Sequence, residues 1–287
     1  MLPQLIALDM DGTLLDGNGQ LPPDFSAIST RARQLGVTLV PASGRQLATL
    51  QEMFPHEDTF IAENGSVVVH DNRVISATTL PTAAVRAVVA ALRTVDAAHT
   101  VVLCTPDTAF VHKGADEQAR AEISKYYRSV EWVDDLGALL DADIIKIAAY
   151  CADGSEKHLH QPLLAAVPEH NIAISGAVWL DVMAAGVNKG EALHTMAELL
   201  AVPMSRTAAF GDFLNDYELL REAGTAIAME NAHPKLKEIA DLIAPPNTEF
   251  GVMTVLRQRK ILESNFRLRP ACRFFTSPSW EKTSYAG

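Results

Sequence analysis

Two aspartates separated by one residue end the first apolar run of the chain. Asp9 and Asp11 lie in the segment DMDGT, directly after Leu5–Leu8. In an extended strand, residues i and i+2 point to the same face, so we expect two carboxylates side by side at the strand's end. Adjacent carboxylates repel each other, and a divalent cation or a shared proton relieves that repulsion. The alternative is an ordinary turn built on Asp and Gly12, whereas an EF-hand loop is excluded because Leu14 stands where that loop needs glycine.

A second acidic cluster, GDFLND over residues 211–216, follows another apolar run and opens a predicted helix. Because the carboxyl ends of parallel strands meet at one edge of a sheet, we expect Asp212 to lie beside Asp9. Their oxygens are the hard ligands that Mg²⁺ takes, with water and a substrate phosphate completing its shell. The alternative is that Asn215 or Asp216 simply caps the following helix.

Donors for a phosphate group are expected at two further places. Ser43 and Gly44 stand between a strand and a helix, so a hydroxyl and free backbone N–H groups are available to an anion. Lys189, at the start of a later helix, can add positive charge. The alternatives are a helix cap at Ser43 and a solvated surface lysine at Lys189. The sequence contains neither a P-loop nor a dinucleotide-binding glycine pattern.

The elements that must position these residues alternate between short apolar strands and helical patterns of about 10–15 residues. This alternation predicts an α/β fold with a Rossmann-like, doubly wound parallel-sheet core. The predicted strands are 5–8, 37–41, 59–62, 67–70, 74–77, 100–104, 109–112, 130–133, 143–150, 171–175, 178–183, 207–210, 225–228 and 241–244. The predicted helices are 24–35, one from about 46, and 82–96, 116–127, 136–141, 155–167, 189–200, 215–222, 234–240 and 251–256.

Within residues 82–186, short turns between neighbouring strands predict an antiparallel sheet and hence an inserted α/β cap domain. The catalytic core is then residues 1–81 together with 187–256. In one cap strand Trp179, Asp181 and Met183 alternate, so that one face of the strand points either towards a substrate or into the packing of the cap sheet.

Composition limits the classes of protein that this chain can belong to. The 287 residues include 48% hydrophobic residues and carry a net charge of −11, which argues against a nucleic-acid-binding surface. No apolar run reaches the roughly 18 residues of a membrane span, and the start of the chain lacks a basic n-region. The 3 cysteines form no metal-binding spacing, so we expect a cytoplasmic protein. Residues 257–287 carry seven basic and two acidic residues, which predicts a basic, aromatic extension outside the core.

Six short motifs, taken in order, resemble the haloacid dehalogenase superfamily, in particular its Cof-type phosphatases with a large α/β cap of type IIB. The motifs are DMDGT (9–13), SGR (43–45), ENG (63–65), GVNKG (186–190), GDFLND (211–216) and AMENAH (228–233). The resemblance spans about residues 5–256 and includes the position of the cap. It implies that the core carries the chemistry and that the cap decides the substrate.

The resemblance also implies roles for individual residues. Asp9 is implied as the nucleophile and Asp11 as the general acid and base. The residues implied to bind phosphate are Ser43, Gly44, Lys189 and Asn215. The residues implied to bind Mg²⁺ are Asp9, Asp11 through its backbone carbonyl, Asp212 and Asp216. The candidates for contact with the rest of the substrate are Asn64, Arg45 and Asp181.

The leading hypothesis is a Mg²⁺-dependent phosphatase of small phosphomonoesters of the sugar phosphate, pyridoxal phosphate or flavin mononucleotide class. Asp11 favours phosphoryl transfer over dehalogenation, because a dehalogenase has no leaving oxygen to protonate. The alternatives are a phosphotransferase or mutase with the same nucleophile, and a non-catalytic protein that binds a phosphorylated ligand. The expected partner is a small phosphorylated metabolite, with no nucleic acid and no membrane; the physiological substrate and the oligomeric state stay open.

Overall fold

Five parallel strands form the first sheet of the chain, whose computed structural model describes residues 3–257. In spatial order they are β14 (Leu242–Ala244), β13 (Ala226–Met229), β12 (Thr207–Gly211), β1 (Leu5–Leu8) and β2 (Thr38–Pro41). β1, β12 and β13 are buried along their whole length, as expected for parallel strands covered on both faces. The predicted parallel core is therefore confirmed.

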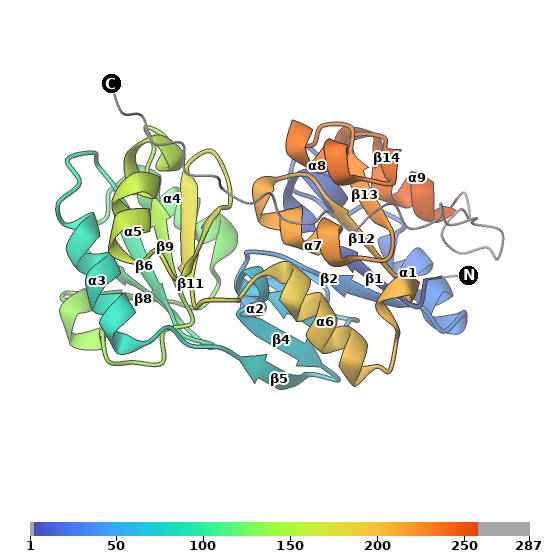
Figure 1. Cartoon of the computed structure of the whole chain (residues 1–287), viewed down its shortest axis with the longest axis horizontal. Helices are drawn as coiled ribbons and strands as arrows, with labels where there is room; N and C mark the ends of the chain where they lie inside the picture. Colours follow the sequence, from blue (N-terminus) through green and yellow to red (C-terminus); the bar gives the residue numbers. More distant parts are fainter. Residues whose placement is uncertain (1–2, 258–287) are drawn as a thin grey trace, which may run out of the picture.

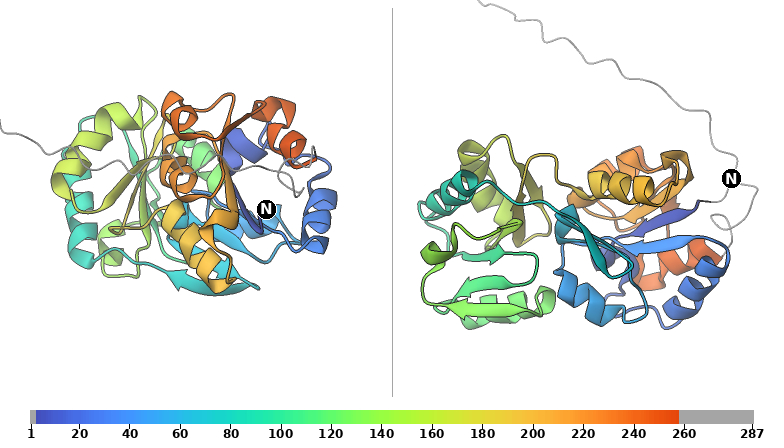
Figure 2. Two further views of the ribbon diagram at one scale, coloured as in Figure 1. Left: turned by 45° about the vertical axis from the view of Figure 1, so that its right-hand side comes forward. Right: turned by 90° about the horizontal axis from the view of Figure 1, so that it is seen from below.

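Helices cover both faces of this sheet (Figures 1 and 2). On one face, α1 (Phe25–Gln34) packs on β2 and α9 (Gly251–Arg257) packs on β14. On the other, α7 (Tyr217–Glu222) and α8 (Pro234–Ile239) pack on β12 and β13, and α6 (Lys189–Leu199) packs on α7. The chain leaves β1 towards β2 on one side and returns to β12 on the other, so the strand order reverses between β1 and β12, where open α/β sheets bind ligands.

A small antiparallel sheet of β3 (Phe60–Ala62), β4 (Val67–His70) and β5 (Arg73–Ala77) extends the core beyond β2. β4 and β5 form the predicted hairpin, and both residues of its turn, Asp71 and Asn72, have positive φ. β3 is linked to the end of β2 by a single bridge between Ala42 and Ile61, and α2 (Leu47–Met53) connects the two strands. The segment after Ala42 is thus held between the two sheets.

Six strands form the sheet of the inserted unit, in the order β10-β11-β9-β6-β7-β8. They are β6 (Thr100–Cys104), β7 (Ala109–His112), β8 (Val130–Val133), β9 (Lys146–Tyr150), β10 (Asn171–Ile174) and β11 (Trp179–Met183). Neighbouring strands are antiparallel, as predicted, except that β7 and β8 are parallel because α4 (Glu117–Tyr126) crosses between them. α3 (Thr82–Leu92) and α5 (Gln161–Ala166) cover one face, and α4 covers the face that looks towards the core.

Some element boundaries differ from the predicted ones. The strand predicted over 143–150 begins only at Lys146, although Ile144 and Ile145 are already buried. The helix predicted over 155–167 is a π-helical turn, Glu156–His160, followed by α5, because Pro162 lacks the N–H that a regular helix requires there. The predicted extension lies outside the described residues from 258 onwards, since α9 ends at Arg257. None of the helices within residues 3–257 has the length and apolar character that a membrane crossing needs.

Candidate active site

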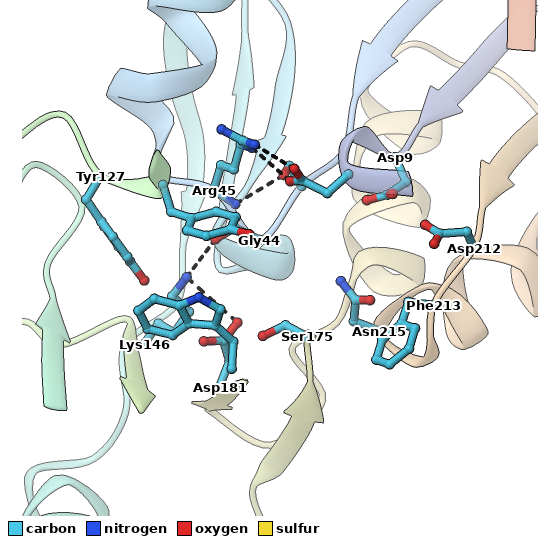
Figure 3. A pocket seen from close by; sticks show the side chains of 14 residues that line it. Asp9, Gly44, Arg45, Tyr127, Lys146, Ser175, Asp181, Asp212, Phe213 and Asn215 are labelled. Atoms are coloured by element: carbon cyan, nitrogen blue, oxygen red, sulfur yellow. Dashed lines mark hydrogen bonds and ion pairs between the residues drawn. The ribbon is translucent and has the colours of Figure 1, made fainter. Parts of the chain in front are cut away.

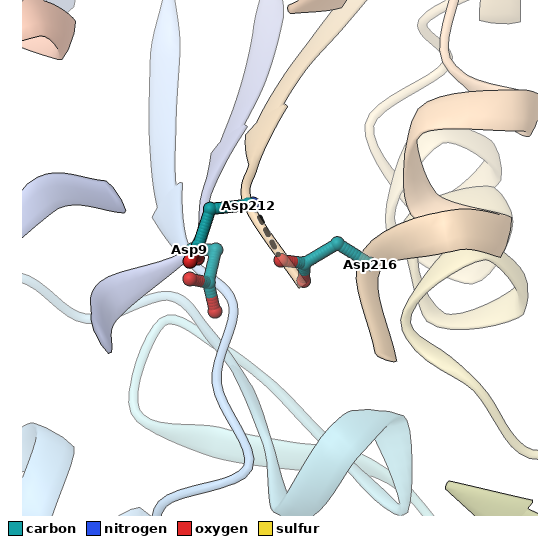
Figure 4. Close-up of side chains that lie close together, drawn as sticks. All are labelled: Asp9, Asp212 and Asp216. Carbon is teal, nitrogen blue, oxygen red and sulfur yellow. Dashed lines mark hydrogen bonds between the residues drawn. The ribbon is translucent and has the colours of Figure 1, made fainter. Parts of the chain in front are cut away.

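Three carboxylates meet where β1 and β12 end (Figure 4). Asp9 follows β1, Asp212 follows β12, and Asp216 ends the 3₁₀ turn that precedes α7. One oxygen from each carboxylate lies within 4.8 Å of the others. The strand-end argument from the sequence therefore places Asp212 beside Asp9 correctly.

Local backbone geometry holds this cluster in place. Gly12 has φ +78°, and a Cβ atom there would lie 2.3 Å from Oδ2 of Asp212, so only glycine fits. The Thr13 hydroxyl donates to Oδ1 of Asp212 at 3.0 Å. Asp216 occupies the N-cap position of α7, but its side chain makes no bond to that helix and instead accepts from the Asp212 backbone N–H at 3.1 Å. The Asp216 carboxylate therefore does not cap α7, but it does cap the preceding 3₁₀ turn, since it also accepts from the Phe213 N–H at 3.4 Å.

Lys189 is the cation of the cluster. It begins α6, its side chain is 0% exposed, and its Nζ donates to Oδ1 of Asp9 at 2.6 Å and to Oδ1 of Asp216 at 2.7 Å. Burial opposes the charged form of Lys189, but Asp216 and Asp9 outweigh it and raise the pKa of the ammonium above its ordinary value. The alternative of a solvated surface lysine is wrong.

One ammonium does not neutralise three carboxylates, and the pKa values reflect this. Burial, followed by the charge of Asp216, raises the pKa of Asp9 to about 7. Burial, followed by the charges of Asp9 and Asp216, raises the pKa of Asp212 to about 9. Carboxylates that resist ionisation so strongly gain from a hard cation between them, and their oxygens are the ligands that Mg²⁺ or a similar ion accepts. The donor set therefore fits a divalent cation.

Asp11 does not lie against Asp9 in the way that strand periodicity predicts. The strand ends at Leu8, and the chain then turns through Met10–Leu14, so the two-residue period no longer applies. The Asp11 side chain is 45% exposed and receives two hydrogen bonds from Arg45, at 2.6 and 2.8 Å. Both aspartates nevertheless line the same pocket.

Arg45 connects Asp11 to the cap. Its Nη1 donates to the backbone carbonyl of Lys125 at 2.8 Å, and its guanidinium lies 4.9 Å from the ring centroid of Tyr126. The next residue, Gln46, accepts from the backbone N–H of Ser129 and donates to its carbonyl. The end of α4 is thus bonded directly to the core next to Asp11.

The segment after β2 carries the two predicted phosphate-binding residues. Ser43 is buried, and its hydroxyl accepts from the Arg45 N–H at 3.1 Å. Because α2 has Gln46 as its N-cap, Ser43 does not cap that helix, and the alternative for it is wrong. The carbonyl of Gly44 accepts from Nζ of Lys146 at 2.7 Å.

A chain of amides joins the core to the cap. Asn215 donates to Oδ1 of Asn64 at 3.1 Å, and Asn64 donates to Oδ2 of Asp181 at 2.6 Å. Asn64 and the preceding Glu63 both have positive φ, 55° and 53°, which is unusual for residues other than glycine. Strained backbone of this kind is typical of functional sites.

Most of these groups line one pocket between the core and the cap (Figure 3). From the core it is lined by Asp9, Asp11, Ser43, Gly44, Arg45, Asp212, Phe213 and Asn215. From the cap it is lined by Tyr126, Tyr127, Lys146, Ser175, Trp179 and Asp181. Trp179 and Asp181 thus face the pocket, whereas Met183 is buried in the cap. Lys189 and Asn64 lie behind the lining, bonded to it.

Sequence reasoning missed several of the cap residues that line the pocket. Tyr126, Tyr127 and Ser175 carry no local pattern that separates them from ordinary residues at the ends of helices and strands. Lys146 does carry a signal, because it is the only charge in the buried run Ile144–Tyr150. A lysine in a fully buried strand needs a partner and is therefore a candidate for function.

Aspartates at the switch point of a doubly wound sheet, a buried lysine and an inserted cap define a class of hydrolases. A family model of haloacid dehalogenase-like hydrolases matches residues 6–256, and the chain belongs to this family. It is similar to the putative phosphatase YkrA of Bacillus subtilis, with 31% identity over 91% of this chain and 99% of YkrA. It is also similar to YbjI of Escherichia coli, a 5-amino-6-(5-phospho-D-ribitylamino)uracil phosphatase, with 30% identity over 88% of this chain and 94% of YbjI.

The fold is shared with BT4131, a sugar phosphatase of subclass IIB, at a TM-score of 0.78 and 20% identity, over 90% of this chain and 99% of BT4131. The chain is thus a phosphatase of the Cof type, and the family predicted from the six motifs is confirmed.

Proposed function

We propose that this protein is a Mg²⁺-dependent phosphatase that hydrolyses small phosphomonoesters through a phosphoryl group carried on Asp9. The observation that carries the proposal is the cluster of Asp9, Asp212, Asp216 and Lys189 at the wall of a pocket that Asp11 also lines. A carboxylate nucleophile, a cation-binding set and a proton donor are the parts that this reaction requires.

Asp9 is the group placed to attack phosphorus. Lys189 binds its Oδ1, which leaves Oδ2 for the attack. The new bond joins Asp9 Oδ2 to phosphorus while the bond from phosphorus to the leaving oxygen breaks, and Asp11 gives that oxygen a proton. Asp11 then takes a proton from water, which attacks phosphorus and releases inorganic phosphate and free Asp9.

Asp212 and Asp216, together with Asp9, would hold Mg²⁺. When bound, the ion supplies positive charge against the phosphoryl oxygens. Ser43 and the N–H of Gly44 would bind those oxygens, and Asn215, which also lines the pocket, would orient them. The cap lining would exclude water from the reacting groups.

A substrate panel tests the proposal. With Mg²⁺ present, the purified protein is expected to release phosphate from at least one of sugar phosphates, pyridoxal phosphate, flavin mononucleotide and 5-amino-6-(5-phospho-D-ribitylamino)uracil, the compound for which YbjI is named. Release of phosphate to water, rather than its transfer to an added sugar, separates a phosphatase from a phosphotransferase. Ligand binding without any phosphate release would indicate a binding protein and contradict the proposal.

The Asp11→Asn variant is expected to separate the two half-reactions. With p-nitrophenyl phosphate, whose leaving group needs no proton, the variant should release one equivalent of p-nitrophenol in a burst and then turn over about 10²–10⁴-fold more slowly than the wild type. With an alkyl phosphate, which does need the proton, the burst should disappear. Rapid-quench and stopped-flow measurements check both results, and a full alkyl phosphate burst in the variant would remove Asp11 as the acid.

The effect of Mg²⁺ on stability is expected to grow as the pH rises. Because the pKa of Asp212 is raised to about 9 and that of Asp9 to about 7, the metal-free folded protein binds more protons than the unfolded chain between roughly pH 4 and pH 9. Its stability therefore falls as the pH rises through this window, while Mg²⁺ binds more tightly because fewer protons compete. The increase in Tm caused by 5 mM Mg²⁺, about the concentration needed to saturate a weak site, should be larger at pH 8.5 than at pH 6. The Asp212→Asn variant should lose most of this difference, and an equal Tm increase at both pH values would contradict the predicted site.

A further inference from the structure

A second buried lysine, Lys146, lines the pocket on the cap side, away from the acidic cluster. Figure 3 shows Lys146, Tyr127 and Asp181 at one end of the pocket and Asp9 and Asp212 at the other. Lys146 is 1% exposed and is the first residue of β9. None of the steps of phosphoryl transfer described above uses it.

The register of the cap sheet places Lys146 and Asp181 on one face. In the pairing of β9 with β11, Lys146 lies opposite Met183 and Ala148 lies opposite Asp181. Side chains two residues apart share a face, so Lys146 and Asp181 are diagonal neighbours. Trp179, two residues before Asp181, shares this face and forms the adjoining aromatic wall.

The ammonium group of Lys146 has three donors, and two groups of the core lie against it, of which only the Gly44 carbonyl accepts a hydrogen bond. Nζ lies 2.7 Å from the carbonyl of Gly44 and 2.5 Å from Oε2 of Glu63. Its distance to Oδ2 of Asp181 is 3.9 Å, which is too long for a hydrogen bond. Lys146 and Asp181 both line the pocket, and Asp181 Oδ2 also accepts from Asn64 at 2.6 Å. An oxygen of a ligand in the pocket can therefore contact both side chains, accepting from Lys146 and donating to Asp181.

Glu63, a residue of the core, adds a negative charge to this end of the pocket. It is fully buried, and neither of its carboxylate oxygens has a well-aligned hydrogen bond among the described residues, although Lys146 lies against it. Its φ of 53° keeps it in the strained turn beside Asn64. With Glu63 and Asp181 against one lysine, the group has a formal charge of −1.

We propose that Lys146 and Asp181 form a leaving-group subsite that binds an uncharged hydroxyl of the substrate, and that Glu63 makes this subsite reject a second anion. The proposal rests on the proposed phosphatase function and adds a charge rule to it, namely that the leaving group of a good substrate carries no second negative charge. A hydroxyl can accept from Lys146 and donate to Asp181, whereas a carboxylate or phosphate offers Asp181 no donor and is repelled by both carboxylates. Three residues from separate parts of the chain thereby become specificity determinants.

Two substrates that differ at one carbon test the charge rule. Sorbitol 6-phosphate and 6-phosphogluconate have the same chain and differ in a hydroxymethyl against a carboxylate at C1. We expect the wild type to prefer sorbitol 6-phosphate by about tenfold or more in kcat/KM, since a neighbouring unit charge in a partly buried site has an effect of at least this size. Glu63→Gln should reduce that preference about tenfold, and wild-type activity on both substrates without preference would overturn the proposal.

A double variant separates recognition from a purely structural ion pair. Lys146→Met leaves Glu63 buried without a counter-charge and is expected to destabilise the protein, whereas Lys146→Met combined with Glu63→Gln removes both charges and should recover the Tm. If Lys146 binds substrate, the double variant stays at least tenfold impaired on sorbitol 6-phosphate and keeps its turnover of acetyl phosphate, which is too small to reach the subsite. Recovery of both stability and sorbitol 6-phosphate activity would overturn the proposal.

The matched control is the exposed cap pair of Arg86 and Asp141, whose neutral double variant should change neither the substrate ratio nor the turnover.

A binding experiment keeps the test independent of turnover. Calorimetry measures the Kd values of sorbitol 6-phosphate and 6-phosphogluconate, the two C6 phosphates, for the Asp9→Asn variant. Failure to hydrolyse any phosphomonoester would count against the phosphatase function, while equal Kd values for the two ligands in this variant would count against the subsite. The subsite proposal would also be overturned if the wild type hydrolysed acetyl phosphate but neither hydrolysed nor bound the two C6 phosphates.

Discussion

The Asp9→Asn variant is expected to lose at least about 10⁴-fold in kcat with every phosphomonoester that the wild type hydrolyses, the scale on which loss of a nucleophile acts. The amide has the shape of the carboxylate but cannot form the bond to phosphorus. Folding should survive, because burial already raises the pKa of Asp9 to about 7 and Lys189 keeps its bond to Asp216 at 2.7 Å. The loss would therefore be one of chemistry rather than of structure.

Trapping of the phosphoryl group gives the decisive measurement. Acid quenching with ³²P-labelled substrate should leave hydroxylamine-sensitive label on the wild type and none on the Asp9→Asn variant. Asp107→Asn, at an exposed position of the cap, is the matched control and should behave as the wild type. Label on the variant, or turnover within tenfold of the wild type, would remove Asp9 as the nucleophile.

The Lys189→Met variant is expected to lose both activity and stability. In the wild type, the ammonium group of Lys189 is the only cation bonded to Asp9 and Asp216 among the described residues. The substitution therefore leaves two buried carboxylates without a counter-charge. Breaking a buried ion pair in this way costs about 3–5 kcal/mol of unfolding free energy. Loss of positive charge at the phosphoryl oxygens should lower kcat by a further factor of about 10²–10³.

The pH dependence of this loss has a definite sign. Lys189 opposes the rise in the pKa of Asp9, so its removal raises that pKa further above the unfolded value of 3.8. A raised carboxyl pKa makes stability fall as the pH rises, so the destabilisation should be larger at pH 8 than at pH 5. Urea unfolding at both pH values measures it, with Lys237→Met on the exposed side of α8 as control. A loss below about 1 kcal/mol at pH 8 would show that the pair contributes little.

The parts of the fold that could be predicted are those with a local cause. Strands such as β1 and β12 are mostly apolar because both of their faces are buried. The turn at Asp71 and Asn72 needs residues that tolerate positive φ. Proline at 162 interrupts a helix for a reason equally visible in the sequence, although the resulting π-helical turn was not predicted.

The parts of the site that could not be predicted depend on partners far away in the chain. The side chain of Lys189 is buried because Asp9, 180 residues earlier, lies against it. Asp11 turns towards Arg45 because the strand ends one residue before Asp9, which no periodicity reveals. Lys146 is bonded to the carbonyl of Gly44, 102 residues away, so only the assembled structure shows what it contacts.

The pairing of β1 with β12 also determines when the site can form during folding. Leu5 lies opposite Thr207, so the central strand pair closes a loop that contains the whole cap. Contacts between such distant segments form slowly, because the entropy of loop closure is lost before the contacts stabilise anything. A nascent chain that has made β1, β2 and even a complete cap sheet still has Asp9 without Asp212 or Lys189. During synthesis, the nucleophile and its charge partners can therefore come together only after the chain has been made as far as Asp216.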